Sequence, residues 1–130
     1  MLQYLSLDWI AALHAAAEAD DALCKAAAGH TVGFTQVVGD GDDGVVYHVS
    51  VRDGVLDIGA GPAHPEDVRL TQRRATAVAV ALGRTNAQEA FISGDIALNG
   101  DLHALREHQS LLMALDRAWE PVRAHTHYGE

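Results

Sequence analysis

The residues of this chain that could carry out chemistry are its eight histidines, its acidic clusters, Ser93 and the single cysteine, Cys24. A dedicated metal site needs three or four His, Cys or carboxylate ligands at characteristic spacings. The sequence contains neither an HExxH helix nor a cysteine pair to complete a site with the imidazoles of "HTH" at 125–127. His103 and His108 are spaced so that they do not share a helix face. We therefore expect no metal site.

Two acidic stretches resemble ligand loops. "GDGDDG" at 39–44 looks like a calcium loop, but it lacks the glutamate at loop position 12 and the alternation of ligands. A solvated hairpin loop is the better interpretation. The second stretch, "SGDIALNGDL", has no Gly-Lys-Ser/Thr and no Gly-x-Gly-x-x-Gly after a strand, so it is not a phosphate loop. Gly94 instead predicts the end of a helix, and Asp101 predicts the cap of the next one.

Catalysis would need a nucleophile with a base, or a paired acid and base. Ser93 in "FISGD" does not lie in a Gly-x-Ser-x-Gly turn, and the spacing of Cys24 is typical of core packing. Asp57 with His64 remains as an example of a pair that a small isomerase or hydratase could use. We nevertheless expect no catalytic residues, no cofactor and no enzyme.

Length and composition indicate one domain. The chain has 130 residues, of which 48% are hydrophobic. We expect a single domain over 1–130, with a core at about 6–120 and a tail at 121–130. The net charge of −9 with only nine Lys and Arg makes nucleic acid an unsuitable partner, and no long apolar run predicts stable membrane insertion.

The absence of a basic leader, together with the single cysteine, leads us to expect a cytoplasmic protein. Many alanines and little lysine suggest a bacterial source.

The N-terminal third is expected to be helical. Ser6 caps a helical region over 6–28, which "ADD" divides so that Asp20 or Asp21 caps a second helix. Gly29 then ends that second helix.

A three-stranded antiparallel meander is expected over 31–60. Asp53-Gly54 is a two-residue hairpin turn because both residues tolerate a positive φ. This turn fixes the register, with Arg52 opposite Val55 and Val49 opposite Ile58. One apolar face results, and another element must cover it.

The second half alternates short elements. A strand "DVRLT", helices over 72–82 and 86–93, and a strand "DIALN" precede a long helix from 102 to about 120. The expected fold class is therefore α+β, a five-stranded mixed sheet with an N-terminal helix, two short helices and a long C-terminal helix covering its apolar face.

The stretch "QEAFISGDIALNGDLHAL" resembles the sterol carrier protein type-2 family. The match runs through Ala90, Phe91, Gly94, Ile96, Leu98, Gly100, Asp101, Leu102 and Leu105, and the resemblance covers about 31–119. It implies a bacterial-type stand-alone domain with an elongated apolar cavity between sheet and helices. Such domains bind fatty acids, acyl esters, sterols or similar lipids as carriers or transfer proteins, and some members dimerise.

The resemblance defines the expected ligand site. Its lining side chains are apolar residues from the sheet and the covering helices: Phe34, Tyr47, Val49, Ile58, Leu70, Val78, Leu82, Phe91, Ile96, Leu105, Leu112 and Trp119. Arg73, Arg74 or Arg84 would hold a polar headgroup at the mouth. Two alternatives stay open: a non-catalytic dimerisation or partner-docking module with a closed core, and a small isomerase or hydratase acting in the same pocket.

Overall fold

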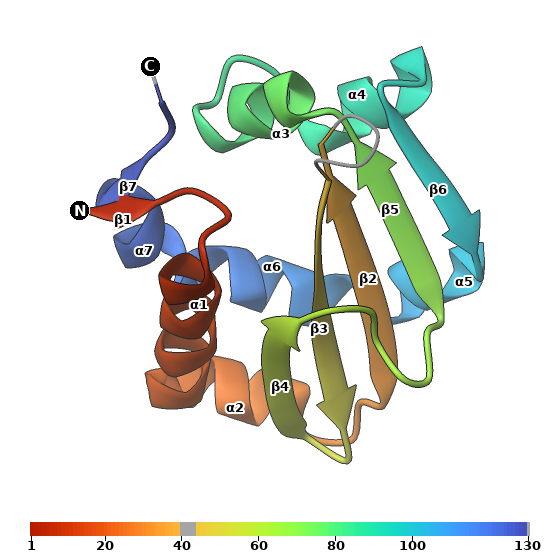
Figure 1. The fold of residues 1–130 in the computed structure, drawn as a ribbon. Coiled ribbons are helices and arrows are strands. Elements are labelled where there is room, and N and C mark those ends of the chain that lie inside the picture. The colour runs from red at the N-terminus through yellow and green to blue at the C-terminus, as the bar shows by residue number, and fades with distance from the viewer. Residues whose placement is uncertain (40–43, 130) are drawn as a thin grey trace.

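The computed structural model describes residues 1–39 and 44–129 (Figure 1). Most of the expected acidic loop at 39–44 lies outside these residues. The central sheet has five strands in the order β4-β3-β2-β5-β6. The parallel pairing of β2 with β5 among antiparallel pairs makes it mixed, so the predicted α+β class is confirmed. The strands are β2 (Val32–Val38), β3 (Val45–Arg52), β4 (Val55–Ala60), β5 (Val68–Gln72) and β6 (Ile96–Gly100).

The predicted N-terminal break is confirmed. Helix α1 covers Leu7–Ala19, and the Ser6 side chain accepts a hydrogen bond from the Trp9 amide at 3.1 Å. Helix α2 covers Asp21–Ala27, and Asp20 caps it by accepting from the Leu23 amide at 2.9 Å. Each cap satisfies an amide that the helix itself leaves without an acceptor.

The hairpin between β3 and β4 has the predicted register. Val49 pairs with Ile58, and Arg52 pairs with Val55. Asp53 has φ 50° and Gly54 has φ 82°, as the expected turn requires.

The predicted short helices are α3 (Arg74–Ala81) and α4 (Ala87–Ser93). Asn86 caps α4 through the Glu89 amide at 2.8 Å, and Gly94 ends it with φ 86°. Asp101 caps the next helix by accepting from the His103 amide at 2.9 Å.

The helix expected from 102 to about 120 is divided at His108. Helix α5 covers Leu102–Glu107 and α6 covers Gln109–Ala118, because His108 has φ −106° and ψ 20°. The break lets α5 pack on β5 while α6 packs on α2. At this point His108 meets His30, with 2.6 Å between their Nδ1 atoms, so one imidazole must donate to the other.

The two ends of the described chain lie side by side. Strand β1 (Leu2–Gln3) pairs in parallel with β7 (Thr126–His127), and helix α7 (Glu120–Ala124) precedes β7 (Figure 1). Val122 and Thr126 are buried. Packing therefore continues beyond the expected core boundary near 120.

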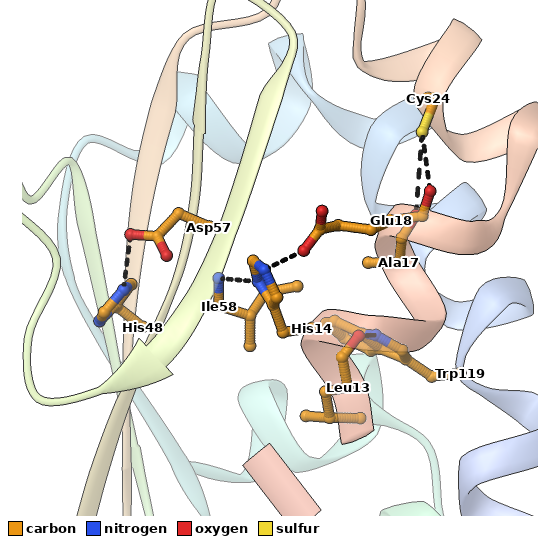
Figure 2. A network of polar contacts seen from close by, with 9 residues as sticks. All are labelled: Leu13, His14, Ala17, Glu18, Cys24, His48, Asp57, Ile58 and Trp119. Carbon is orange, nitrogen blue, oxygen red and sulfur yellow. Dashed lines mark hydrogen bonds and ion pairs between the residues drawn. The ribbon is translucent and has the colours of Figure 1, made fainter. Parts of the chain in front are cut away.

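Helix α1 is tied to the edge strand and to the C-terminal helices. His14 Nδ1 accepts a hydrogen bond from the Ile58 amide of β4 at 3.1 Å, and its Nε2 contacts Glu18 (Figure 2). Trp119 Nε1 donates to the Leu13 carbonyl at 3.0 Å. These contacts fix α1 as one wall beside the sheet. None of the helices in the described part of the chain is long and apolar enough to span a membrane.

Candidate ligand-binding cavity

A cavity of about 910 Å³ lies between the sheet and the helices. This volume is in the range of small-molecule pockets, roughly 300–1,000 Å³. Its walls come from β2, β3, β5, β6 and every helix except α2. The lining residues are Tyr4, Trp9, Leu13, Gln36, Tyr47, Leu70, Gln72, Ala77, Val80, Ala81, Gly83, Ala87, Gln88, Phe91, Ile96, Leu98, Leu102, Leu105, Arg106, Leu112, Asp116, Trp119, Arg123 and Tyr128.

The sheet register builds the floor of this cavity. Gln36 pairs with Tyr47 on one side and with Leu70 on the other, and Leu70 pairs with Leu98. One row across four strands therefore faces the cavity. Gln72 and Ile96 form a second row two residues farther along.

Seven of the twelve expected lining residues border the cavity. They are Tyr47, Leu70, Phe91, Ile96, Leu105, Leu112 and Trp119.

Three expected sheet residues are not cavity residues. Phe34, Val49 and Ile58 are 2–5% exposed and belong to the closed core. They lie two positions along the strands from the floor row, which is about 6–7 Å at the usual strand rise. Helices α1 and α2 contact β4 at that end of the sheet, so the layers meet there and leave no space. Alternation predicted the correct face, but it carries no information on where the layers separate.

The two lining residues expected from the helix at 72–82 also lie outside the lining. Val78 is buried in the core, and Leu82 is 42% exposed. The cavity stripe of α3 is Ala77, Val80 and Ala81 instead. These three follow the i, i+3, i+4 spacing of one helix face, so the prediction selected the adjacent stripe.

Sequence reasoning missed the polar members of the lining. Gln36 follows Val32 and Phe34 in alternation, and Gln72 follows Val68 and Leu70, so both amides occupy inward positions of neighbouring strands. A glutamine at an inward strand position is the signal that could have identified them. Tyr4 and Tyr128 were missed because the pairing of β1 with β7 brings them in from opposite ends of the chain.

Four aromatic residues close one end of the cavity. The Trp9 ring meets the Tyr4 ring at 4.9 Å and the Tyr47 ring at 5.4 Å, both edge to face. Tyr4 also meets Tyr128 at 4.9 Å. Burial raises the pKa of Tyr4 to about 12, and it raises the pKa of Tyr47 and of Tyr128 as well. All three phenols are therefore uncharged donors at neutral pH.

The charged residues of the lining are Arg106, Asp116 and Arg123. Arg123 Nη1 forms an ion pair with Asp116 Oδ1 at 3.1 Å. The arginines expected at the mouth, Arg73, Arg74 and Arg84, are not among the lining residues. Arg74 instead donates to the Tyr128 carbonyl at 3.4 Å and covers the Tyr4 ring from outside the lining.

The acid–base pair considered from sequence is not the pair that the structure forms. Asp57 Oδ2 lies 3.2 Å from His48 Nε2 (Figure 2). His48 Nδ1 lies 3.1 Å from the Gly61 carbonyl oxygen. Both imidazole nitrogens of His48 thus face oxygen atoms. Neither His48 nor Asp57 lines the cavity. Within residues 1–39 and 44–129, no three His, Cys, Asp or Glu side chains gather to hold a metal ion.

A five-stranded mixed sheet, helices over one face and an apolar cavity between the layers define a domain of the sterol carrier protein type-2 fold. The chain belongs to the alkyl sulfatase C-terminal family, whose model matches residues 24–123. The resemblance drawn from "QEAFISGDIALNGDLHAL" is therefore confirmed in its fold. No curated protein matches the chain significantly.

Solved structures agree on the fold. A possible sterol carrier protein from Thermus thermophilus is 20% identical with a TM-score of 0.73, covering 94% of this chain and 91% of that one. Apo sterol carrier protein 2 from Yarrowia lipolytica is 14% identical with a TM-score of 0.66, and the match covers 89% of this chain and 98% of that one. Sterol carrier protein 2 like 2 from Aedes aegypti is 19% identical with a TM-score of 0.54, and the match covers 79% of this chain and 91% of that one.

Proposed function

We propose that this domain binds a hydrophobic small molecule in the cavity and acts as a lipid carrier or transfer protein, without catalysing a reaction. The observation that carries the proposal is the volume of about 910 Å³ inside a fold whose remaining core is closely packed. Filling that space with hydrocarbon would remove leucine and aromatic surface from water. Burial of apolar area is worth about 25 cal/mol per Å² before the costs of ordering.

The similar proteins support a ligand with a long apolar part. The family is named for alkyl sulfatases, and the similar structures are named for sterol carriers. Hydrocarbon is the chemistry that these names share. The single cysteine leaves no internal disulfide to form, which suits a carrier in the reducing cytoplasm.

We expect the ligand to contact the seven lining residues that the sequence predicted, together with Leu98 and Leu102. Leu70 is the best position at which to block the site, because it lies in the middle of the floor row between Gln36 and Leu98. A tryptophan at this position would project into the cavity. Val55 is a matched control, since it lies on the same sheet but is 69% exposed and outside the lining.

Displacement of the neutral fluorescent probe N-phenyl-1-naphthylamine from delipidated protein tests the proposal. We expect the probe to bind at one molecule per chain and to be displaced by ten- to sixteen-carbon amphiphiles. Leu70→Trp should weaken probe binding at least about tenfold, whereas Val55→Trp should leave it unchanged. Absence of binding, or equal binding by the two variants, would show that the interior is closed and would favour the docking-module alternative.

A further inference from the structure

The sheet side of the cavity carries uncharged polar groups that have no hydrogen-bond partner in the described part of the chain. The side-chain oxygen of Gln72 is buried without a hydrogen bond, and so is the indole nitrogen of Trp9. No hydrogen bond joins the Gln36 amide, the Tyr47 hydroxyl or the Tyr4 hydroxyl to another group among the described residues. Tyr4 as a whole is only 7% exposed.

These groups lie together. Gln36 and Tyr47 are direct partners across β2 and β3. Gln72 lies on β5, opposite Val38 and thus two residues beyond Gln36 on the neighbouring strand. Tyr4 reaches the same end through the aromatic contacts with Trp9, which itself meets Tyr47. We call Gln36, Tyr47 and Gln72, with Tyr4 beside them, the polar floor.

A purely hydrocarbon ligand fits the polar floor poorly. Buried donors and acceptors without partners are unfavourable, and a hydrocarbon would exclude water from them while offering no hydrogen bond. A hydroxyl can both donate and accept, so it can serve a phenol and a glutamine amide together. The terminal torsion of glutamine is broad, so Gln36 and Gln72 can turn toward such a group with little strain.

A charged headgroup fits the polar floor less well. The phenols stay protonated because burial raises their pKa values, and the nearby Arg123 is paired with Asp116. A carboxylate or sulfate placed here would lose its hydration, and Arg74, whose guanidinium lies over the Tyr4 ring, is outside the cavity lining. Arg106, on α5, is the lining residue that such an anion would be expected to use instead.

We propose that the ligand is an uncharged amphiphile whose hydroxyl or carbonyl group binds the polar floor while its hydrocarbon lies against Phe91, Leu102 and Leu105. This inference rests on the proposed function and names its ligand class. A long-chain alcohol is the simplest member of that class. Gln36 and Gln72 are then the residues that determine specificity.

The experiment compares three ten-carbon ligands that differ only in their polar end: 1-decanol, decanoate and decane. Each displaces N-phenyl-1-naphthylamine from the wild type and from the double variant Gln36→Leu/Gln72→Leu. We expect wild type to prefer 1-decanol to decane by about tenfold or more, since each neutral hydrogen bond contributes about 0.5–1.5 kcal/mol. The double variant should lose that preference while binding decane at least as tightly. Val55→Leu, on the same sheet but outside the lining, is the control that should keep the preference.

A second measurement does not depend on ligand. Replacing the two amides by leucine should raise the midpoint of thermal unfolding of the ligand-free protein, because the buried Gln72 oxygen that lacks a hydrogen bond is removed. An unchanged preference for 1-decanol in a folded double variant would overturn the inference. The inference would also be overturned if wild type bound decanoate more tightly than 1-decanol and Arg106→Gln lost that tighter binding. Failure of all three ligands to displace the probe, or failure of the probe itself to bind, would instead overturn the proposed function.

Discussion

Two adjacent leucines of α6 distinguish the closed core from the cavity wall. Leu111 is fully buried in the core, whereas its neighbour Leu112 is half-buried and borders the cavity. Leu111→Ala should lower the free energy of unfolding by about 3–4 kcal/mol, because it removes packed methyl groups and leaves a void. Leu112→Ala should lower it by only about 1 kcal/mol, because part of that side chain already faces the cavity and no new enclosed void forms.

Both substitutions lie inside the same helix, so the change in helix propensity is the same and cancels between them. Urea unfolding measures the stability of each variant without ligand, and probe titration measures the affinity. Ligand affinity should show the opposite order, because Leu112→Ala should lower the affinity about three- to tenfold and Leu111→Ala should lower it less than about twofold. If Leu112→Ala costs as much stability as Leu111→Ala and leaves the ligand affinity unchanged, Leu112 is packed in a filled core and borders no cavity.

Three further predictions concern the scaffold. Burial raises the pKa of Tyr4 to about 12, against about 10 in the unfolded chain, so the stability that its neutral phenol contributes is complete below pH 10 and is lost between pH 10 and 12. Urea unfolding at pH 8 and pH 11 should therefore show a smaller loss of unfolding free energy for Tyr4→Phe than for wild type. An equal loss would contradict the raised pKa of Tyr4. Gly33→Ala should destabilise by more than about 2 kcal/mol, because the added Cβ would lie 2.1 Å from the Pro65 carbonyl oxygen. A Cβ at Gly29 would meet no atom within 4 Å, and asparagine tolerates the φ of 82° there, so Gly29→Asn should lower the melting temperature much less than Gly33→Ala. Asn86→Ala should cost about 1 kcal/mol through loss of the α4 cap, measured by thermal unfolding, and a change within error would show that the cap is not formed in solution.

Local signals in the sequence were enough to predict most of the scaffold. The hairpin register followed from Asp53-Gly54, because a two-residue turn with two positive φ angles leaves one pairing. Asp20, Asn86 and Asp101 each cap a helix through their own side chains, so the information lies within three residues of each cap.

The features that escaped prediction depend on distant contacts. The division of the last helix at His108 coincides with a contact to His30, and no local breaker residue marks that site. The pairing of β1 with β7 joins the two ends of the described chain, so neither strand has a signal of its own.

The cavity was predicted on the correct sheet face but not at the correct depth. Phe34 and Leu70 both face the helices, yet Phe34 is packed in the core and Leu70 lines open space. Periodicity specifies the direction of a side chain, whereas the separation of the layers depends on how α3 to α6 dock on the sheet. The same limit hid Gln36 and Gln72, whose inward positions become meaningful only once the space beside them is known.

Intermolecular nuclear Overhauser effects between unlabelled 1-decanol and methyl-labelled protein would test the central claim most directly. We expect cross-peaks from the ligand chain to the methyl groups of Leu70, Leu98, Leu105 and Leu112, and none to Leu23 or Leu111, which are fully buried in the core. Cross-peaks confined to exposed methyl groups such as those of Val55, or no cross-peaks at saturating ligand, would contradict a ligand held between the sheet and the helices.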